Sequence, residues 1–120
     1  MIIYREFQFD AAHWVESERW DSSQPNGRCH GHQWSVVVWF EGEKKHDGMV
    51  IDYSVIDNCL TPLRTELDHH TLNDIMKTPT NEAIAKWVFE KVNTISGLPG
   101  CVSVDVNRKI NGMLAGVKYP

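Results

Sequence analysis

Three histidines of this sequence have a spacing that suits a metal ion held on a β-sheet. His30 and His32 stand at the start of a β-branched, aromatic run, so their side chains leave one face of a strand with Cα atoms roughly 6.5 Å apart. His13 ends another predicted strand, and its side chain is expected on the same face as the apolar residues of that strand. If the strands form a hairpin, three neutral imidazoles can hold a zinc ion with one position open, as in catalytic zinc sites. A polar turn and a strand-end histidine without a metal are the alternative.

A second group of proton-active side chains lies in the segment LDHHTLND, from Leu67 to Asp74. Asp68 adjoins His69, and a carboxylate next to an imidazole can hold the tautomer of the ring and raise its basicity for general base catalysis. Capping of a helix end is the other interpretation, because Asp and Asn favour such positions.

Cys29 is a third candidate, because a thiol near a cationic centre is acidified and becomes nucleophilic. It immediately precedes His30. Neighbouring residues of a strand point to opposite faces, so Cys29 faces away from a metal held by His30 unless the chain is irregular there. A buried and inert thiol is the alternative, and it is the interpretation we favour for Cys59 and Cys101.

The bulk composition is that of a small globular protein. A chain of 120 residues fits one domain, residues 1–120, with a core that needs no disulfides. The net charge of -4 argues against a nucleic-acid partner, and three cysteines without CxxC spacing favour a reducing cytoplasm. No segment has the apolar core of a signal peptide or approaches the roughly 20 apolar residues of a membrane span. We therefore expect a soluble, unprocessed, cytoplasmic protein with no membrane partner.

The elements that must position these residues begin with two strands. The first ends near His13, where Phe7, Phe9 and Ala11 give one face its apolar character. The second follows His32 as QWSVVVWFEG and is apolar on both faces, so we expect both faces to be buried. A long loop of charged residues, Ser, Pro, Asn and Gly joins the two strands, and loops of that length are commonly functional.

A short strand and a helix come next. GMVIDY, residues 48–53, predicts the strand. The helix runs from about Ser54 to Leu67, with Asp52 or Ser54 as its N-cap. Pro62 is expected to kink this helix or to restart it.

The last third of the chain predicts one more helix and two strands. Thr78 or Thr80 caps the helix, and the strands run through Val102 to Val106 and near Leu114 to Tyr119. Asn111-Gly112 between them is a strong hairpin signal. The order β-β-α-α-β-β implies an α+β domain with the helices on one face of an antiparallel sheet.

Five motifs spread over the whole chain resemble the family of 6-pyruvoyl-tetrahydropterin synthases and 6-carboxytetrahydropterin synthases. Each motif alone is weak, whereas their order and separations together make a chance resemblance improbable. The motifs are FDAAH at 9–13, HGH at 30–32, GMVIDY at 48–53, LDHHTLN at 67–73 and PTNEAIAKW at 79–87.

The resemblance implies the tunnelling fold, a four-stranded antiparallel sheet with two helices on one face. Subunits of this family trimerise into a barrel and usually pair into hexamers, with sites at subunit boundaries, so a homo-oligomer is expected. The resemblance also implies a Zn2+ cofactor on His13, His30 and His32. Asp68 and His69 match an Asp-His pair that works with a cysteine in moving protons.

The resemblance implies a pterin substrate as well. Family members act on 7,8-dihydroneopterin triphosphate, which loses triphosphate while its side chain is rearranged. The bacterial branch forms 6-carboxy-7,8-dihydropterin with release of acetaldehyde, on the route to queuosine. We therefore expect a zinc-dependent lyase in which the metal serves as Lewis acid and template.

Two departures from the family bear on this function, and the first concerns the cysteine. In the family it stands a few residues before HGH, at positions that are Gln24 and Asn26 in this chain. Neither side chain can form a thiolate. Either the loop reshapes to bring Cys29 over the zinc, or the thiol function is lost.

The second departure is the loss of a glutamate that binds the pterin just after the strand matching Val102 to Val106. Asn107 and Arg108 are nearest to its place, and Asp105 is the only carboxylate in reach. We name Asp105 and Arg108 as candidate substrate-binding residues, and an arginine there would favour an anionic group. Two alternatives follow: a paralogue that keeps the zinc but acts on another substrate, and a non-catalytic ligand-binding subunit.

Overall fold

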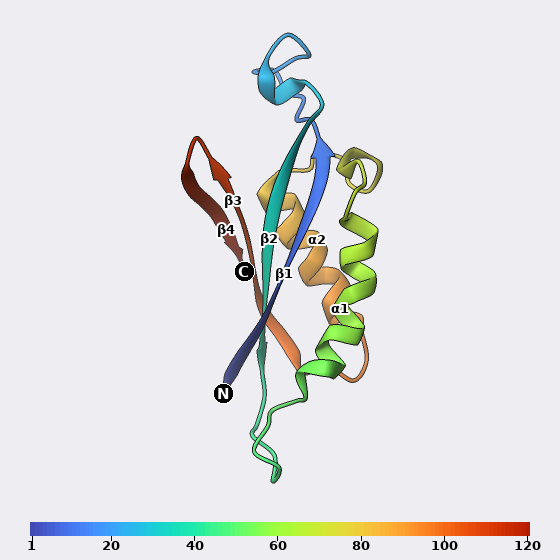
Figure 1. Ribbon diagram of the computed structural model, residues 1–120, viewed down its shortest axis with the longest axis vertical. Coiled ribbons are helices and arrows are strands. Elements are labelled where there is room, and N and C mark those ends of the chain that lie inside the picture. The colour runs from blue at the N-terminus through green and yellow to red at the C-terminus, as the bar shows by residue number, and fades with distance from the viewer.

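Four antiparallel strands form one sheet, and two helices cover one of its faces, in this computed structural model of residues 1–120 (Figure 1). The strands, in their order across the sheet, are β1 (Ile2–His13), β2 (His30–Glu41), β3 (Gly100–Ile110) and β4 (Met113–Tyr119). The helices that join β2 to β3 are α1 (Tyr53–Leu67) and α2 (Asn81–Asn93). The predicted α+β class and the order β-β-α-α-β-β are confirmed.

The long hairpin of β1 and β2 sets the position of the three histidines. The strands pair antiparallel along their full length, with His13 opposite His30 and Ala11 opposite His32. Side chains alternate between the two faces of a strand, so all three histidines lie on the face that carries Trp34. This is the face that the helices cover.

The loop between β1 and β2 is closed by its own backbone just before Cys29. It contains a short 3-10 helix, Pro25–Gly27, and the Val15 amide donates to the Asn26 carbonyl at 2.8 Å. A Cβ atom on Gly27 would lie 1.8 Å from the Asp21 carbonyl oxygen, so this close approach of two backbone segments requires glycine.

Each helix begins at one of the cap residues that the sequence predicts. Asp52 caps α1 by accepting a hydrogen bond from the Ser54 amide (2.8 Å), and Thr80 caps α2 by accepting one from the Ala83 amide (3.2 Å). α1 continues through Pro62 and is not restarted there. The apolar residues on both sides of the proline pack on the sheet, and such packing contributes most of the stability of a protein helix. Neither helix is long and apolar enough to cross a lipid bilayer.

The core lies between the sheet and the two helices. On β2 the buried positions are Trp34, Val36, Val38 and Phe40, all with no exposed surface. The positions between them are only half-buried, Trp39 included. The prediction that both faces of β2 are buried is wrong for the single chain, because both helices lie on the same side of the sheet (Figure 1).

The segment GMVIDY does not form the predicted strand. Residues 48–52 are bends and irregular chain, and the Lys45 amide donates to the Met49 carbonyl (2.8 Å) in a local turn. Val50 is buried at the end of the sheet, so close to Gly42 that a Cβ there would lie 2.7 Å from its methyl group. The apolar residues therefore fill the end of the core while the chain turns from β2 into α1.

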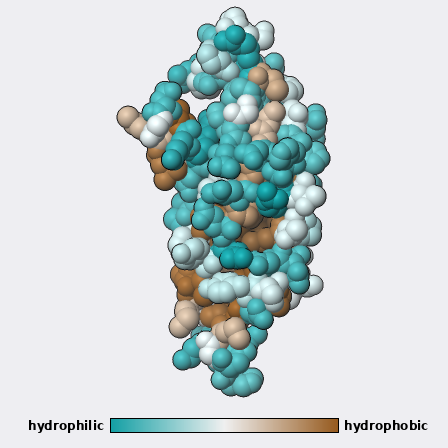
Figure 2. Space-filling model, in the orientation of Figure 1, coloured by the Kyte–Doolittle hydropathy of each residue, from teal (hydrophilic) through white to brown (hydrophobic).

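The predicted hairpin turn at Asn111-Gly112 is confirmed. Both residues have positive φ, 53° and 76°, as the tight turn between twisted strands requires. The tip of this β3–β4 hairpin is apolar and exposed, and Figure 2 shows it as a hydrophobic area that stands away from the body of the molecule. Its exposed side chains are Ile110 (42%), Met113 (74%) and Leu114 (70%).

Candidate metal centre

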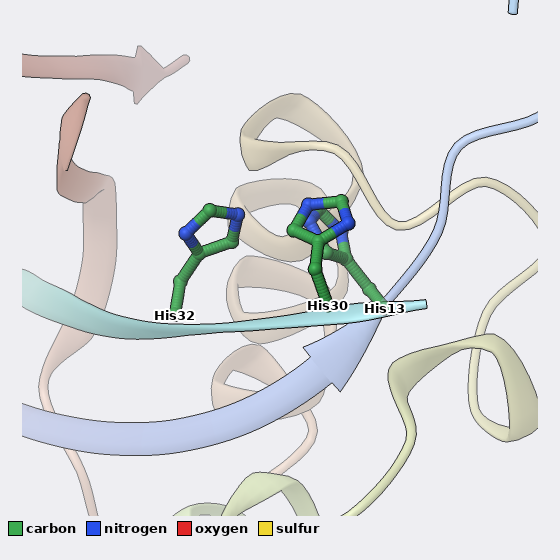
Figure 3. A group of neighbouring side chains, drawn as sticks. All are labelled: His13, His30 and His32. Atoms are coloured by element: carbon green, nitrogen blue, oxygen red, sulfur yellow. The ribbon is translucent and has the colours of Figure 1, made fainter. Parts of the chain in front are cut away.

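Three histidine rings converge on the helix-facing side of β1 and β2 (Figure 3). One nitrogen from each of His13, His30 and His32 lies within 4.8 Å of the other two. The ring centroids are 4.6 Å apart for His13 and His30, 4.7 Å for His30 and His32, and 5.1 Å for His13 and His32. The predicted convergence of the three side chains is therefore confirmed.

Hydrogen bonds at Nδ1 leave the Nε2 atoms of two rings without a proton, as metal ligation requires. Nδ1 of His13 lies 2.7 Å from the Pro79 carbonyl oxygen, and Nδ1 of His30 lies 2.6 Å from that of Arg28. A carbonyl only accepts, so each Nδ1 carries the proton and each Nε2 keeps its lone pair. Nε2 of His32 is buried without a partner. One orphaned nitrogen beside two oriented lone pairs fits the nitrogen ligand set of a Zn2+ ion.

Burial keeps two of the ligands in the neutral form that a metal requires. His13 is 2% exposed, and burial lowers its pKa to about 4 despite the hydrogen bond to the Pro79 carbonyl. Burial also lowers the pKa of His32 to about 4, and the nearby Arg108 guanidinium adds to the effect. Both rings are thus unprotonated near neutral pH, so no proton competes with a metal ion for them.

The start of α2 orients the cluster. The Pro79 carbonyl fixes His13, and two residues later Asn81 Oδ1 accepts a hydrogen bond from the Trp34 indole N–H at 3.0 Å. The Trp34 ring meets His13 and His32 edge to face, with centroids 5.0 and 5.2 Å away. The motif at 79–87 therefore acts at the metal centre through its neighbours, by fixing a tautomer and locking the ring that the ligands pack against.

Asp68 and His69 form a hydrogen-bonded pair at the outer edge of β1. His69 Nδ1 lies 2.8 Å from one carboxylate oxygen of Asp68, and the other oxygen accepts from the Asp10 amide at 2.9 Å. The Asp10 amide and then His69 hold the pKa of the Asp68 carboxyl below its ordinary value. His69 has a φ of 57°, rare for a residue with a side chain, and 79% of its side chain is exposed.

One histidine of the pair and one histidine of the cluster line the same groove. His69 lines a groove of about 530 Å³ with His32, but no hydrogen bond links His69 to the cluster. Asn73 ties the segment to the sheet by bonding both the amide (3.0 Å) and the carbonyl (2.9 Å) of Trp14. The proton-relay role of Asp68 and His69 stays a prediction.

Cys29 lies at the rim of a cavity that the metal cluster also borders. This cavity of about 600 Å³ is lined by Cys29, His30, His32 and Arg108 among others. Cys29 is exposed and forms no disulfide, and it stands in irregular chain just before β2. Cys29 thus lies in irregular chain, where strict alternation of strand faces does not apply, and the catalytic role of its thiol stays a prediction.

The two candidate substrate-binding residues lie on opposite faces of the sheet. Arg108 is on the cluster face, and its Nη1 lies 3.3 Å from Nε2 of His13. Asp105 is on the far face, where Lys118 Nζ lies 2.7 Å from one carboxylate oxygen and the Trp39 indole donates to the other at 2.9 Å. Substrate binding by either residue stays a prediction.

Glu82 lies near the histidine cluster, although it was not among the site residues predicted from the sequence. A second cavity of about 290 Å³ is lined by His13, His30 and Arg108 and by Glu82 from the first turn of α2. In the sequence, Glu82 lies in the first turn of the predicted helix, where the helix dipole favours a negative charge. Its position inside the motif PTNEAIAKW is the signal that could have identified it.

Residues 2–115 of the chain match the family described as 6-pyruvoyl tetrahydropterin synthase. The chain belongs to this family. Among solved structures, the 6-pyruvoyl tetrahydropterin synthase of Caenorhabditis elegans matches with a TM-score of 0.82 at 21% identity, covering 100% of this chain and 96% of that one. The predicted tunnelling fold is thereby confirmed.

Two relatives of this chain carry the names of two different enzymes. The 6-carboxy-5,6,7,8-tetrahydropterin synthase of Synechocystis sp. is 39% identical over 116 residues, covering 88% of this chain and 84% of the relative. The dihydroneopterin monophosphate aldolase of Pyrococcus furiosus is 42% identical over 103 residues, covering 86% and 82%. This member of the 6-pyruvoyl tetrahydropterin synthase family is a pterin-metabolising lyase of the 6-carboxytetrahydropterin synthase-like type, so the prediction of an enzyme is confirmed.

Proposed function

We propose that this enzyme uses Zn2+ bound by His13, His30 and His32 to convert 7,8-dihydroneopterin triphosphate to 6-carboxy-7,8-dihydropterin. The observation that carries the proposal is the convergence of one nitrogen from each ring within 4.8 Å. The similarity to the Synechocystis 6-carboxy-5,6,7,8-tetrahydropterin synthase supports the choice of reaction. A place on the route to queuosine belongs to the same proposal.

Bound zinc would supply Lewis-acid stabilisation of negative charge on the substrate side chain as a carbon-bound proton leaves. The protein contributes the geometry. The carbonyls of Pro79 and Arg28 hold His13 and His30 with Nε2 available to the ion. The buried Trp34 ring packs against the cluster and keeps water away from that side.

Asp68 and His69 are the proposed proton relay. The carboxylate accepts the Nδ1 proton of His69, which leaves Nε2 as the atom that takes up or returns a proton. Cys29 is the proposed third proton-transfer group, because it stands at the rim of the cavity that His30 and His32 also line.

We propose further that the enzyme is a cytoplasmic homo-oligomer, a trimer or hexamer, whose sites lie at subunit boundaries. The exposed His69 ring supports this arrangement, since it is open to a substrate or a second subunit rather than enclosed by its own chain. The half-buried far face of the sheet offers a surface for subunit contacts. The apolar tip of the β3–β4 hairpin offers another (Figure 2). Three free cysteines support a reducing compartment.

A second candidate function is cleavage of a phosphorylated dihydroneopterin by an aldolase on the same zinc scaffold. The relative from Pyrococcus furiosus that is named dihydroneopterin monophosphate aldolase favours it. Two residues of this chain favour it as well. Asn26 stands where the family pattern has a thiol, and Arg108 stands near the place of the pterin-binding glutamate.

Product analysis separates the two candidates. The purified enzyme, with its metal content measured by elemental analysis, is incubated with 7,8-dihydroneopterin triphosphate and separately with the monophosphate. We expect one zinc per chain, turnover that a chelator abolishes and zinc restores, and the mass of 6-carboxy-7,8-dihydropterin among the products. A product with a shortened side chain from the monophosphate would support the aldolase instead, and zinc-loaded protein that turns over neither compound would contradict both functions.

A further inference from the structure

Arg108 reaches across the sheet into the metal centre. It is on β3, yet its Nη1 donates toward Nε2 of His13 at 3.3 Å, and its guanidinium carbon lies 5.9 Å from the centre of the Trp34 ring. The guanidinium thus occupies space beside the lone pair that a metal ion uses. Any ligand bound at the metal must share this space with a permanent positive charge.

The guanidinium of Arg108 has no anionic partner in the chain. Its Nε–H is buried and makes no hydrogen bond, and no carboxylate lies within ion-pairing distance of it. Arg5 and Arg64, in contrast, each lie beside a carboxylate, at 2.6 Å and 3.7 Å. A buried guanidinium donor without a partner is costly, so the site is incomplete as the chain alone forms it.

The cavity in front of Arg108 is positive. Arg28, Arg108 and Lys109 line its volume of about 600 Å³, and no Asp or Glu lines it. This arrangement stands out in a chain whose net charge is -4. Burial lowers the pKa of Arg108, and the charge of Glu82, which lines the adjoining cavity, offsets only part of this effect.

We propose that Arg108 binds an oxyanionic group of the ligand, a phosphate or a carboxylate, directly beside the metal centre. The planar guanidinium offers parallel N–H donors that match two oxygens of such a group, and its buried Nε–H is free to be one of them. Arg28 and Lys109 attract the same charge at the rim. The inference rests on the proposed zinc site, and it makes Arg108 the residue that selects ligands with an anionic group at this position.

Calorimetric titration of the zinc-loaded protein tests this proposal without any turnover. The probes are inorganic phosphate and acetate, and the variants are Arg108→Gln, Arg108→Lys and Lys44→Gln. Lys44 is an exposed cation in the turn after β2 and serves as the control for charge alone. Zinc content and circular dichroism are measured for each protein before titration.

We expect Arg108→Gln to weaken binding of the preferred probe by roughly ten- to a hundredfold, as loss of a charge-assisted hydrogen bond does. Arg108→Lys keeps the charge but lacks the two parallel donors, so its affinity is expected to lie between those of Arg108→Gln and the parent. Lys44→Gln is expected to bind as the parent does. Stronger binding of phosphate than of acetate would identify a phosphate ester as the ligand group, and the reverse order would identify a carboxylate.

Equal affinities of the parent, Arg108→Gln and Arg108→Lys at equal zinc content would overturn the proposal, and so would a parent that binds neither probe. These outcomes leave the lyase function untouched, because turnover is measured separately. Protein that binds no zinc would overturn the proposed function together with this inference. Arg108-dependent binding of a probe by a protein that turns over no pterin would support the inference and contradict the proposed function.

Discussion

The histidine cluster and the Asp68–His69 pair are held by the fold in different ways. The cluster projects toward the core from the ends of β1 and β2 where His13 pairs with His30, and His13 is almost fully buried. The pair lies on an irregular segment at the sheet edge, held by backbone contacts to Asp10, with the His69 ring mostly exposed. A metal centre needs fixed ligands, whereas a proton-transfer group needs access to what it protonates. The two regions therefore have separate structural supports, and variants in one are expected to spare the other.

The variant with the largest expected effect disrupts the histidine cluster alone. His30→Ala removes one of the three proposed ligands, so we expect zinc content to fall toward zero. Turnover should fall by about a thousandfold or more, since Lewis-acid stabilisation contributes several kcal/mol to the transition state. Elemental analysis and steady-state kinetics measure both quantities. His46→Ala, in the exposed turn after β2, is the control, and full zinc occupancy in His30→Ala would contradict the assignment of the ligand.

The variant with the next largest expected effect disrupts the Asp68–His69 pair and leaves the histidine cluster intact. Asp68→Asn removes the charge and leaves only one accepting oxygen for the Asp10 amide and His69 Nδ1, which use two oxygens in the parent. We expect turnover to fall by roughly a hundredfold or more while zinc content stays unchanged. His70→Ala is the neighbouring control, because its ring bonds only the Asp68 carbonyl. Loss of zinc from Asp68→Asn would show that the two regions are not independent.

A smaller effect tests how the core supports the cluster. Asn81→Ala leaves the buried Trp34 indole N–H without an acceptor, so the free energy of unfolding is expected to fall by about 1–3 kcal/mol. Urea denaturation of the protein measures it. Asn58→Ala, on the exposed side of α1, should change stability by less than about 0.5 kcal/mol. Equal effects of the two variants would count against the support that we assign to Asn81.

The smallest expected effect is the pH dependence of the contribution that Asp68 makes to the free energy of unfolding. The folded pKa of Asp68 lies below its ordinary value of 3.8, so its ionised form is favoured by folding. The stabilisation is present above the ordinary value and is lost as the pH falls through the lowered one. The difference in urea midpoint between the parent and Asp68→Asn should therefore shrink as the pH falls below about 4. A difference that does not change with pH would contradict the hydrogen bonds to the carboxylate.

Features that depend on neighbours along the chain could be predicted from the sequence. The turn at Asn111-Gly112 was predicted, and each observed cap, Asp52 and Thr80, was one of two predicted candidates, because these features act within a few residues. The prediction of a strand at residues 48–53 was wrong, because a strand depends on contacts with residues far away in the chain. A strand requires a partner edge, and this segment instead turns at the end of the sheet with Val50 as a core residue.

The three histidines could be predicted because one hairpin contains them all. Strand parity and an antiparallel turn are enough to bring His13 beside His30 and His32. The nearness of Arg108 to His13 could not be obtained in that way. It depends on the register between β2 and β3, two strands that are separated in the chain by both helices.

By itself the sequence determined the order of elements, the candidate helix caps, the hairpin turn and the strand parity that brings three histidines together, since each follows from local periodicity and spacing. Only the tertiary structure decided what surrounds these histidines. Pairing of β3 with β2 placed an unpaired arginine beside the cluster and turned Asp105 to the far face, and docking of α2 supplied the Pro79 carbonyl. These contacts join residues far apart in the chain, so their geometry depends on how the whole sheet and its helices pack.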